Sequence, residues 1–539
     1  MPSDINGMPP AALRRRLDLP GLVSMAILLG ALLLVLITAT GSPQKDDVAW
    51  LLYVARKWLG GQRLYDDIIE VNPPLIVWLY ALPAQVSVWT GLAPKTVSAP
   101  FFAAILMGCA WWTATLLKGQ AALFARRLPV FGAIGTVLLL LPGVEFGQRE
   151  HLLVATALPY LALFARERAG TGVSARQAAL IGAVAALGCA LKPSYVVAFA
   201  ALEAMGRLHG LRLLRPAPLA AAATLALYGL VVLTVCPAFL EKAVPLALAL
   251  YGGTDTPMWD LLTEGRLLMA GVAVLTMLAL LARPILPKGE ALPRHLLVAA
   301  AVFATAATLS YLLQGKDWFY HRLPATTVTI LALLAWSAAM LGQRPWASRR
   351  HLLRVAVPAT LALSMLAWFG QDNYQRMERW ITAAVEPDLS TEVRLERLVK
   401  REHAKTYIAF SEWIALGFPV VNDTGVTWAS RFDSMWALKG ELWRARQDGA
   451  APQAWPIRRW IARDFVANCP DLAVVDTREG INYVAVLSAS DPDFAEAWSR
   501  YRQIASFDGL RVLRRDEAGC VPTPRPGRAR MTATAMEPP

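Results

Sequence analysis

The sequence predicts a polytopic α-helical membrane protein with a small C-terminal α/β domain, and three observations support this prediction. The chain of 539 residues is 56% hydrophobic and only 17% charged. Its apolar residues come in blocks of roughly 17 to 21, about the length that a helix needs to cross a bilayer. Its basic residues gather in alternate short loops, as the positive-inside rule describes. Together these properties indicate an integral membrane protein.

Eleven membrane-spanning helices are expected. If the segments 1–20, 118–127, 166–176, 207–215, 283–294 and 344–354 are cytoplasmic, they hold 19 Lys and Arg against 4 Asp and Glu. The opposite short loops hold 10 against 12, so the charge bias places the N-terminus in the cytoplasm and the C-terminus outside. The expected spans lie at about 21–41, 98–117, 128–144, 151–166, 177–191, 193–206, 216–236, 266–283, 296–313, 323–342 and 353–370.

A twelfth apolar segment, 74–90, is expected not to cross. It is 17 residues long and contains Pro83, and the region 74–117 needs an odd number of crossings to satisfy the charge bias. We therefore expect it to lie along the outer leaflet or to dip into it, within a first external loop at 42–97. The aromatic residues that would form part of an interfacial belt are Trp50, Tyr53, Trp58, Trp78 and Trp89.

The composition excludes several other classes of protein. The formal net charge of +13 suggests a nucleic-acid partner, but no basic stretch is interleaved with stacking aromatic residues. The five cysteines form no CxxC motif and no Cys/His cluster, so zinc and redox motifs are absent. Arg14, Arg15 and Arg16 precede an apolar run that is too long for the core of a signal peptide, so we expect the first membrane helix there.

From about residue 371 the composition changes to that of a small external α/β domain, 371–520. Apolar β-type runs lie at 406–410, 418–422, 472–476 and 510–513, with helical stretches at about 390–402, 434–448, 455–468 and 491–503. Cys469 and Cys520 both fall in this domain, and the sequence leaves open whether they pair or stay as two thiols. Residues 521–539, rich in Pro, Arg and small residues, are expected to be a disordered tail.

The stretch 41–78, GSPQKDDVAWLLYVARKWLGGQRLYDDIIEVNPPLIVW, contains the main candidate for catalysis. Asp46 and Asp47 open a short aromatic-rich helix. At the first turn of a helix the dipole favours an ionised carboxylate, which is suited to act as a base. The alternative is that one of these residues only caps the helix, which is a common role of Asp.

Polar residues in apolar surroundings all fall on the same, external side of this topology. Several loops that deliver both signs of charge to one membrane face imply a shared polar site, because such groups are costly at membrane depth. Taken singly, these clusters have plainer explanations: a hydrated loop at 145–151, a snorkelling Lys192, and interfacial cations beside the aromatic residues at 318–320. The residues are Asp46, Asp47, Asp66, Asp67, Glu70, Asn72, Glu145, Gln148, Arg149, Glu150, His151, Lys192, Tyr195, Asp255, Asp260, Gln314, Lys316, Asp317, Tyr320 and His321.

The acidic pair followed by Asn72-Pro73-Pro74-Leu75 resembles the polyprenyl-phosphate-sugar-dependent glycosyltransferases of the GT-C superfamily, nearest to the protein O-mannosyltransferases and the lipid A aminoarabinose transferases. Their pattern is an Asp-Glu pair about thirty residues before Lys-Pro-Pro-Leu. The resemblance, which covers the layout of roughly residues 20 to 370, implies a GT-C-like fold in the bacterial inner membrane with a periplasmic C-terminal domain. It also implies that Asp46 is the catalytic base, with Asp47 as its neighbour. Asn72 departs from the pattern, because the aminoarabinose transferases have a phosphate-contacting lysine there.

These features lead us to expect an inverting glycosyltransferase that takes a sugar from a polyprenyl-phosphate donor to a glycan, lipid or protein of the cell envelope. No cofactor is expected, although Asp46, Asp47 and Glu145 are also suited to bind a divalent ion, and the sequence leaves that alternative open. A transporter or flippase and a noncatalytic partner in envelope assembly are the other hypotheses. The residues expected to bind substrate are Glu70, Asn72, Glu145, Arg149, Glu150, His151, Lys192, Tyr195, Lys316, Tyr320 and His321.

Overall fold

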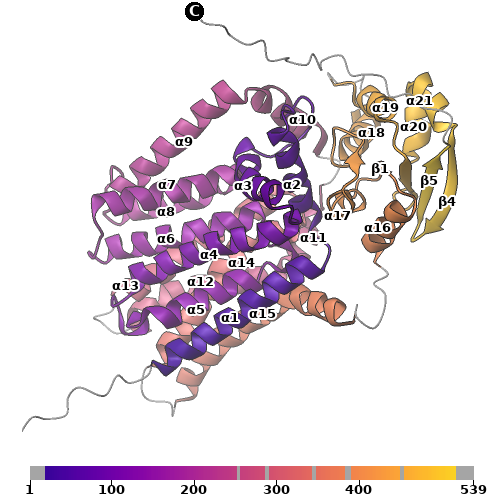
Figure 1. The fold of residues 1–539 in the computed structure, drawn as a ribbon. Coiled ribbons are helices and arrows are strands. Elements are labelled where there is room, and N and C mark those ends of the chain that lie inside the picture. Colours follow the sequence, from indigo (N-terminus) through magenta and orange to yellow (C-terminus); the bar gives the residue numbers. More distant parts are fainter. Residues whose placement is uncertain are drawn as a thin grey trace, which may run out of the picture.

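The computed structural model describes residues 18–251, 255–285, 291–342, 348–382, 390–448 and 455–516. The chain forms a bundle of helices, and a mixed α/β domain lies against one end of it (Figure 1). The expected disordered tail, 521–539, lies outside the described residues. Cys469 is disulfide-bonded, and Cys520 lies outside the described residues.

Six of the described helices are long and apolar enough to cross a membrane. They are α1 (Leu19–Gly41), α4 (Pro94–Leu117), α9 (Pro216–Val235), α13 (Ala291–Gln314), α14 (Phe319–Leu341) and α15 (Arg349–Thr382). A seventh is obtained if α11 (Met258–Glu264) and α12 (Arg266–Ile285), which meet at a bend of 68°, count as one broken span. Large apolar side chains on α9 are exposed, among them Leu227, Leu230 and Leu233, as expected of a helix that faces lipid.

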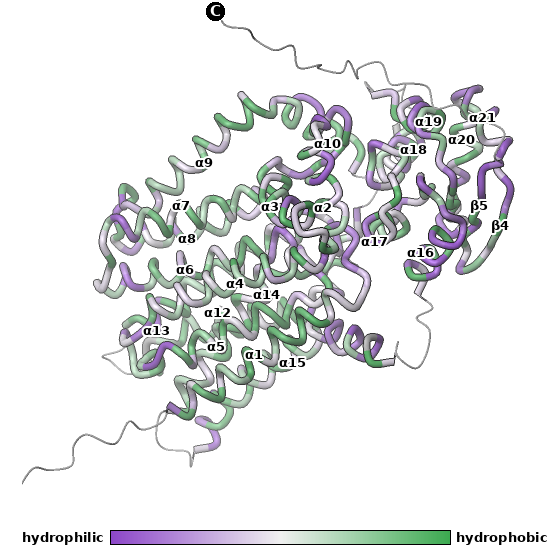
Figure 2. The backbone as a smooth tube through the Cα atoms, viewed as in Figure 1, coloured by the Kyte–Doolittle hydropathy of each residue, from purple (hydrophilic) through white to green (hydrophobic). Residues whose placement is uncertain are grey.

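Four further helices correspond to the other expected spans and lie beside the long ones in Figure 1. They are α5 (Arg127–Leu140), α6 (Arg149–Arg168), α7 (Ala175–Leu191) and α8 (Val196–Leu208). Three of them have fewer than 18 residues, and α6 carries charges at both ends. Hydrophobic residues dominate the bundle helices, whereas hydrophilic residues gather at the two ends of the bundle and within the α/β domain (Figure 2).

The helices α2 (Asp46–Leu59) and α3 (Pro74–Thr90) lie together at the end of the bundle next to the α/β domain (Figure 1). The hydroxyl of Tyr80 in α3 donates to the carbonyl of Gly147, just before α6, at 2.9 Å. With 17 residues, α3 falls short of the length of the six long helices. The remaining short elements of the bundle are η1 (Ala122–Phe124), η2 (Gly143–Glu145), η3 (Pro193–Tyr195), η4 (Phe239–Ala243) and α10 (Val244–Leu250).

The C-terminal domain contains a five-stranded mixed sheet with the strand order β2-β1-β3-β5-β4. The strand β1 pairs in parallel with β2 and β3, and β5 is antiparallel to β3 and β4. The strands are β1 (Thr406–Phe410), β2 (Thr427–Trp428), β3 (Leu472–Asp476), β4 (Tyr501–Phe507) and β5 (Leu510–Arg515). The helices are α16 (Thr391–Arg401), η6 (Ile414–Leu416), α17 (Val420–Thr424), α18 (Trp436–Asp448), α19 (Ile457–Asn468), α20 (Tyr483–Ser490) and α21 (Pro492–Trp498).

Two expectations for this domain are wrong. The apolar run 418–422 is not a strand, because its last three residues lie in the one-turn helix α17. Phe418, just before this helix, packs edge-on against Trp50 of α2 with 5.0 Å between ring centroids. Gly425, at φ 75°, ends the helix. The expected helix 491–503 ends at Trp498, and the chain continues as the edge strand β4. Asp508 and Gly509, at φ 52° and 72°, then form a tight turn into β5.

Arg376 fixes the position of the loop that leads into α2. This residue of α15 is buried, and its guanidinium donates to Ser42 Oγ at 3.0 Å, to the carbonyl of Thr38 at 3.0 Å and to that of Gly143 at 3.3 Å. The end of α1 and the short helix η2 are thereby joined through one side chain. Since Asp46 follows the first and Glu145 lies in the second, Arg376 holds these two carboxylates near each other.

Substitution of Arg376 by methionine is expected to lower the stability of the bundle end. The change removes three buried hydrogen bonds, and its cost is expected to be about 1–3 kcal/mol in the free energy of unfolding. The measurement is the thermal unfolding midpoint in detergent. Arg379→Met is the control, because Arg379 lies one turn further along the same helix and is exposed. Equal midpoints for the two variants would contradict this role of Arg376.

Candidate functional site

Asp46 and Asp47 lie in the first turn of α2, next to the loop that precedes α6. Lys45 occupies the N-cap position without making a side-chain cap, and its Nζ lies 3.1 Å from Asp46 Oδ1 and 3.7 Å from Glu145 Oε1. Gln148 Nε2 donates to Asp47 Oδ2 at 3.0 Å and to Glu145 Oε2 at 3.2 Å. We call Lys45, Asp46, Asp47, Glu145 and Gln148 the acidic group. The two expected carboxylates of α2 are thus joined to a third.

Burial and charge shift the protonation equilibria of this group. Burial raises the pKa of Glu145 to about 8, although the ammonium of Lys45 opposes the shift. Burial also raises the pKa of Asp46, again against the effect of Lys45. Burial alone would lower the pKa of Lys45, but the carboxylates around it raise that pKa above its usual range. The side chain of Asp46 keeps 15% of its exposure, so solvent or a substrate can reach it.

Glu70 lies between the helix α2 and the segment that leads into α3. Its Oε2 accepts the indole N–H of Trp50 at 2.5 Å, and its Oε1 accepts both the backbone and the side-chain N–H of Asn72, at 2.8 and 2.5 Å. Burial raises the pKa of Glu70, and these hydrogen bonds and the charge of Arg149 oppose the shift. Asn72 therefore directs its donors at Glu70, and the charge of Arg149 acts on the same carboxylate.

A second group surrounds the buried carboxylate of Glu150. We call Arg149, Lys192 and His321 the basic group. Lys192 Nζ lies 3.0 Å from Glu150 Oε1, and His321 Nε2 lies 3.7 Å from the same oxygen and 3.2 Å from Lys192 Nζ. Arg149 Nε is 3.9 Å from Glu150 Oε2, and its guanidinium lies 5.7 Å from the ring centre of Tyr320. Residues from α6, α14 and the end of α7 thus meet at one point.

Arg149 connects the two groups. It is 4% exposed, and it interacts electrostatically with Asp47 and Glu70 as well as with Glu150 and Tyr320. Its Nε has no hydrogen-bond partner among the described residues. A buried guanidinium with an unused donor is suited to receive an anionic oxygen of a ligand.

Other expected site residues are held away from this centre. Both ring nitrogens of His151 contact backbone groups, the carbonyl of Leu138 at 2.8 Å and the N–H of Gly147 at 3.2 Å. The hydroxyl of Tyr195 donates to the carbonyl of His321, and so it positions the backbone of that residue. Both side chains therefore bind backbone groups next to the site and do not point into it.

Several predicted residues form ion pairs outside the two groups, although Lys316 is itself buried and its charge acts on the ring of His321. Lys316 Nζ lies 2.7 Å from the carbonyl of Tyr251 and 2.5 Å from Asp255 Oδ1. The other pairs at this end join Asp66 to Lys242 and Arg63, Asp67 to Arg63, and Asp317 to Arg322. Gln314 donates to the carbonyl of Ser310, one turn earlier in α13. Asp260 is exposed, and its backbone N–H donates to the carbonyl of Pro257 at 3.0 Å.

Four residues that the sequence did not single out as site residues take part in the site: Lys45, Trp50, Tyr251 and Asp433. Lys45 adjoins the acidic pair in sequence, so its place beside Asp46 could have been anticipated. Trp50 is at position i+4 from Asp46 on α2, which places it on the same helix face. Tyr251 and Asp433 come from distant segments, and both interact electrostatically with Asp47 and Glu70. Nothing local in the sequence indicates these two.

The described residues contain no group of three or more His, Cys, Asp or Glu side chains arranged to hold a metal ion. Asp46 and Glu145, which were candidates for such a group together with Asp47, instead share the ammonium of Lys45. The arrangement offers a partly exposed carboxylate at a helix N-terminus and, on the other side of Asp47, buried cations. A carboxylate of this kind can accept a proton, and the cations can stabilise negative charge that develops on a leaving group.

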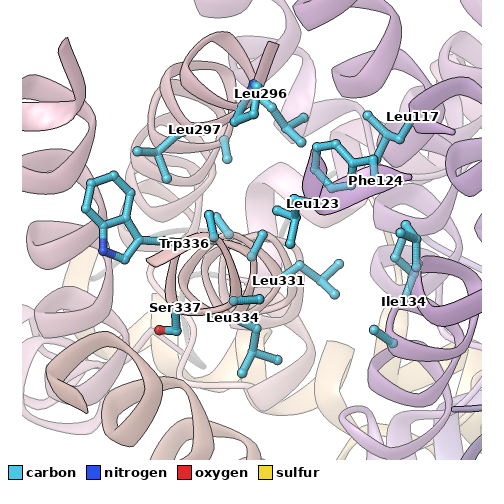
Figure 3. A pocket seen from close by; sticks show the side chains of 18 of the residues that line it. Leu117, Leu123, Phe124, Ile134, Leu296, Leu297, Leu331, Leu334, Trp336 and Ser337 are labelled. Atoms are coloured by element: carbon cyan, nitrogen blue, oxygen red, sulfur yellow. The ribbon is translucent and has the colours of Figure 1, made fainter. Parts of the chain in front are cut away.

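An apolar cavity of about 540 Å³ lies in the opposite half of the bundle (Figure 3). Leu296 and Leu297 of α13 and Leu331, Leu334 and Trp336 of α14 line it, and no charged side chain is among its lining residues. The lining residue of α14 nearest to His321 in sequence is Val328, seven residues or roughly 10 Å further along the helix, and no residue of the acidic or basic group lines the cavity. The cavity is therefore separate from the polar site and is suited to an apolar chain.

Comparison of the chain with protein-family models and with curated protein sequences found no match.

The ion pair between Glu150 and Lys192 is expected to be strongly coupled. Either Glu150→Gln or Lys192→Met leaves a buried charge without its closest partner, which costs about 3–5 kcal/mol. The double variant is expected to lose less stability than the sum of the single ones. Unfolding in detergent measures the four proteins of this cycle. The exposed pair Arg63–Asp67, with 3.4 Å between its charged atoms, provides the control cycle with a coupling near zero. Strict additivity for Glu150 and Lys192 would contradict the geometry.

Glu145→Gln is expected to change how stability depends on pH. Because the folded pKa of about 8 exceeds the usual value of 4.5, the folded protein binds more protons than the unfolded one between these values. The stability contributed by Glu145 is therefore complete below about pH 4.5 and falls as the pH rises towards 8. The midpoint of the wild type should decline relative to that of Glu145→Gln across this range. Parallel curves of the midpoint against pH for the two proteins would show that the pKa of Glu145 is not raised in the folded protein.

Proposed function

We propose that the protein is an inverting membrane glycosyltransferase that uses a polyprenyl-phosphate-linked sugar as its donor. The acceptor is a hydroxyl of a glycan, lipid or protein of the cell envelope. The observation that supports this best is the meeting of the acidic group and the basic group around Arg149. A transfer from a lipid phosphate needs both a base and cations for the phosphate, and this site offers both within one end of the bundle.

In this mechanism Asp46 is the general base. The acceptor oxygen attacks the anomeric carbon of the sugar, and its proton passes to a carboxylate oxygen of Asp46. The bond between the anomeric carbon and the phosphate oxygen breaks, and the polyprenyl phosphate leaves with both bonding electrons. This single displacement inverts the anomeric centre. Asp47, held by Gln148, orients the acceptor or the base.

Arg149 takes the part of the cation that the GT-C pattern has at the position of Asn72. It interacts electrostatically with Glu70, the carboxylate to which Asn72 is bonded, and its Nε has no hydrogen-bond partner among the described residues. On the other side of Glu150, Lys192 adds a positive charge and His321 adds a ring nitrogen. Together these groups bind the phosphate of the donor and stabilise it as it leaves.

The topology in this proposal has eleven crossings: the six long helices, the bent pair α11–α12, and the helices α5 to α8. The N-terminus is cytoplasmic, and the polar site and the C-terminal domain face the periplasm of a bacterial inner membrane, as the loop charges indicate. The helix α3 lies in the outer interface. This placement puts the site where lipid-linked sugars reach the outer leaflet.

Transfer from a panel of radiolabelled polyprenyl-phosphate sugars tests the proposal. Membranes containing the wild type should consume one donor. Asp46→Asn should lower the rate by a factor of about 10² to 10⁴, because the base is lost while the donor site remains. Asp66→Asn is the matched control, since Asp66 lies in the same loop but pairs with Lys242. Equal rates for wild type and Asp46→Asn would leave a transporter or an assembly partner as the better hypothesis.

A further inference from the structure

The C-terminal domain contributes the segment 430–436 to the polar site. The backbone N–H of Ile69, next to Glu70, donates to the carbonyl of Arg431 at 2.8 Å. At the other end of the segment, the ring of Trp436 packs on that of Tyr251 with 4.6 Å between centroids. Asp433 and Ser434 lie in the chain between these two contacts. They are therefore placed between Glu70 and Tyr251.

This segment is firmly held by its own domain. The backbone and side chain of Arg431 donate to the carboxylate of Asp464 at 2.9 Å in three hydrogen bonds. The carbonyl of Phe432 accepts the indole N–H of Trp428 at 2.6 Å, and the N–H of Met435 donates to the carbonyl of Ser411 at 2.8 Å. A tip fixed on both sides places its polar side chains reproducibly.

At this tip, two buried polar atoms lack hydrogen-bond partners among the described residues: Asp433 Oδ1 and Ser434 Oγ. Asp433 is 7% exposed and Ser434 is 2% exposed. Burial raises the pKa of Asp433 well above its usual value, and the carboxylates of Glu70 and Asp47 raise it further. A buried carboxyl with an unused oxygen, facing two like charges, is costly for folding. Such a cost is typical of a group kept for a ligand.

We propose that Asp433 and Ser434 bind hydroxyl groups of the sugar of the lipid-linked donor, so that the C-terminal domain forms one wall of the donor site. This inference rests on the proposed function. The carboxyl of Asp433 and the hydroxyl of Ser434 can accept hydrogen bonds and, when they carry a proton, donate them. A sugar hydroxyl can do both, whereas a fully ionised phosphate can only accept. Sugar hydroxyls fit both unused acceptors.

The position of Asp433 indicates the donor sugar and not the acceptor. Tyr251, which adjoins this segment through Trp436, interacts electrostatically with both Asp433 and Arg149. A sugar joined to a phosphate at Arg149 lies next to that phosphate, on the side of Tyr251 and Asp433. The acceptor must instead reach Asp46, whose other neighbours are Lys45 and Glu145. Asp433 is thus a binding residue that discriminates between sugars.

Thermal shifts with two ligands separate sugar contacts from phosphate contacts without requiring turnover. The purified full-length protein in detergent is mixed with a polyprenyl phosphate, or with the same lipid carrying the sugar that the wild type consumes. The sugar-bearing lipid should raise the midpoint of the wild type more than the sugar-free lipid does. In Asp433→Asn this increment should disappear while the shift with the sugar-free lipid remains. Asp493→Asn, an exposed residue of the same domain, should behave as the wild type.

The same variants distinguish binding from a structural role. Asp433→Asn keeps the shape of the side chain and replaces a buried titratable group beside Glu70 and Asp47 by a neutral amide, so its midpoint without ligand should equal or exceed that of the wild type. Its affinity for the donor should fall about tenfold or more, the effect of one lost hydrogen bond to a charged group. Ser434→Ala should show a smaller loss in the same direction.

Two results would overturn the inference in different ways. A sugar-dependent increment that is unchanged in Asp433→Asn means that Asp433 does not contact the sugar, while the proposed transferase function stands if Asp46→Asn is inactive. No shift of the wild type with either lipid removes the donor site itself, and with it both the inference and the proposed function.

Discussion

The burial of the Glu150 carboxylate is the constraint on which the rest of this site depends. Its side chain is inaccessible to solvent, and an isolated charge in such a place would destabilise the fold by several kcal/mol. Three helices supply the compensation, because Arg149, Lys192 and His321 approach it from α6, the end of α7 and the start of α14. Their ends must therefore meet at one point. The positive charges of Arg149 and Lys192 are therefore held there before any ligand binds, a preorganised arrangement of the kind that the proposed transfer needs.

The acidic pair is held with similar rigidity, but by different means. Trp50 of α2 donates to Glu70 on one side and packs against Phe418 of the C-terminal domain on the other. The side chain of Asn422 donates to the backbone carbonyl of Ala49 at 2.7 Å. The helix α2 is thus fixed between the bundle and the domain, and Asp46 stands at its fixed end. A carboxylate on a rigid helix keeps its geometry better than one on a free loop.

The bundle and most of the sheet could be predicted because their signals are local. Apolar runs of sufficient length predict the long helices, and the runs 406–410 and 472–476 form strands as expected. The errors arise where a distant partner decides. The apolar side chain of Phe418 contacts Trp50 of the bundle and is not part of a strand. The strand β4 is half exposed because it pairs with β5 at the edge of the sheet, so its sequence has no continuous apolar run. The sequence could predict that the polar residues of the site meet at one end of the bundle. It could not predict the place of Asp433, since 360 or more residues separate it from Asp47 and Glu70.

The two halves of the bundle bear on the choice between transfer and transport. A path for a sugar phosphate across the membrane needs polar or charged groups along its length. The cations and carboxylates described above lie at one end, whereas the cavity in the other half has an apolar lining that includes Trp336 and no charged side chain. An apolar cavity would stop a charged headgroup but can hold a hydrocarbon chain. This asymmetry agrees better with the proposed transfer at one face than with transport of a sugar phosphate across the membrane.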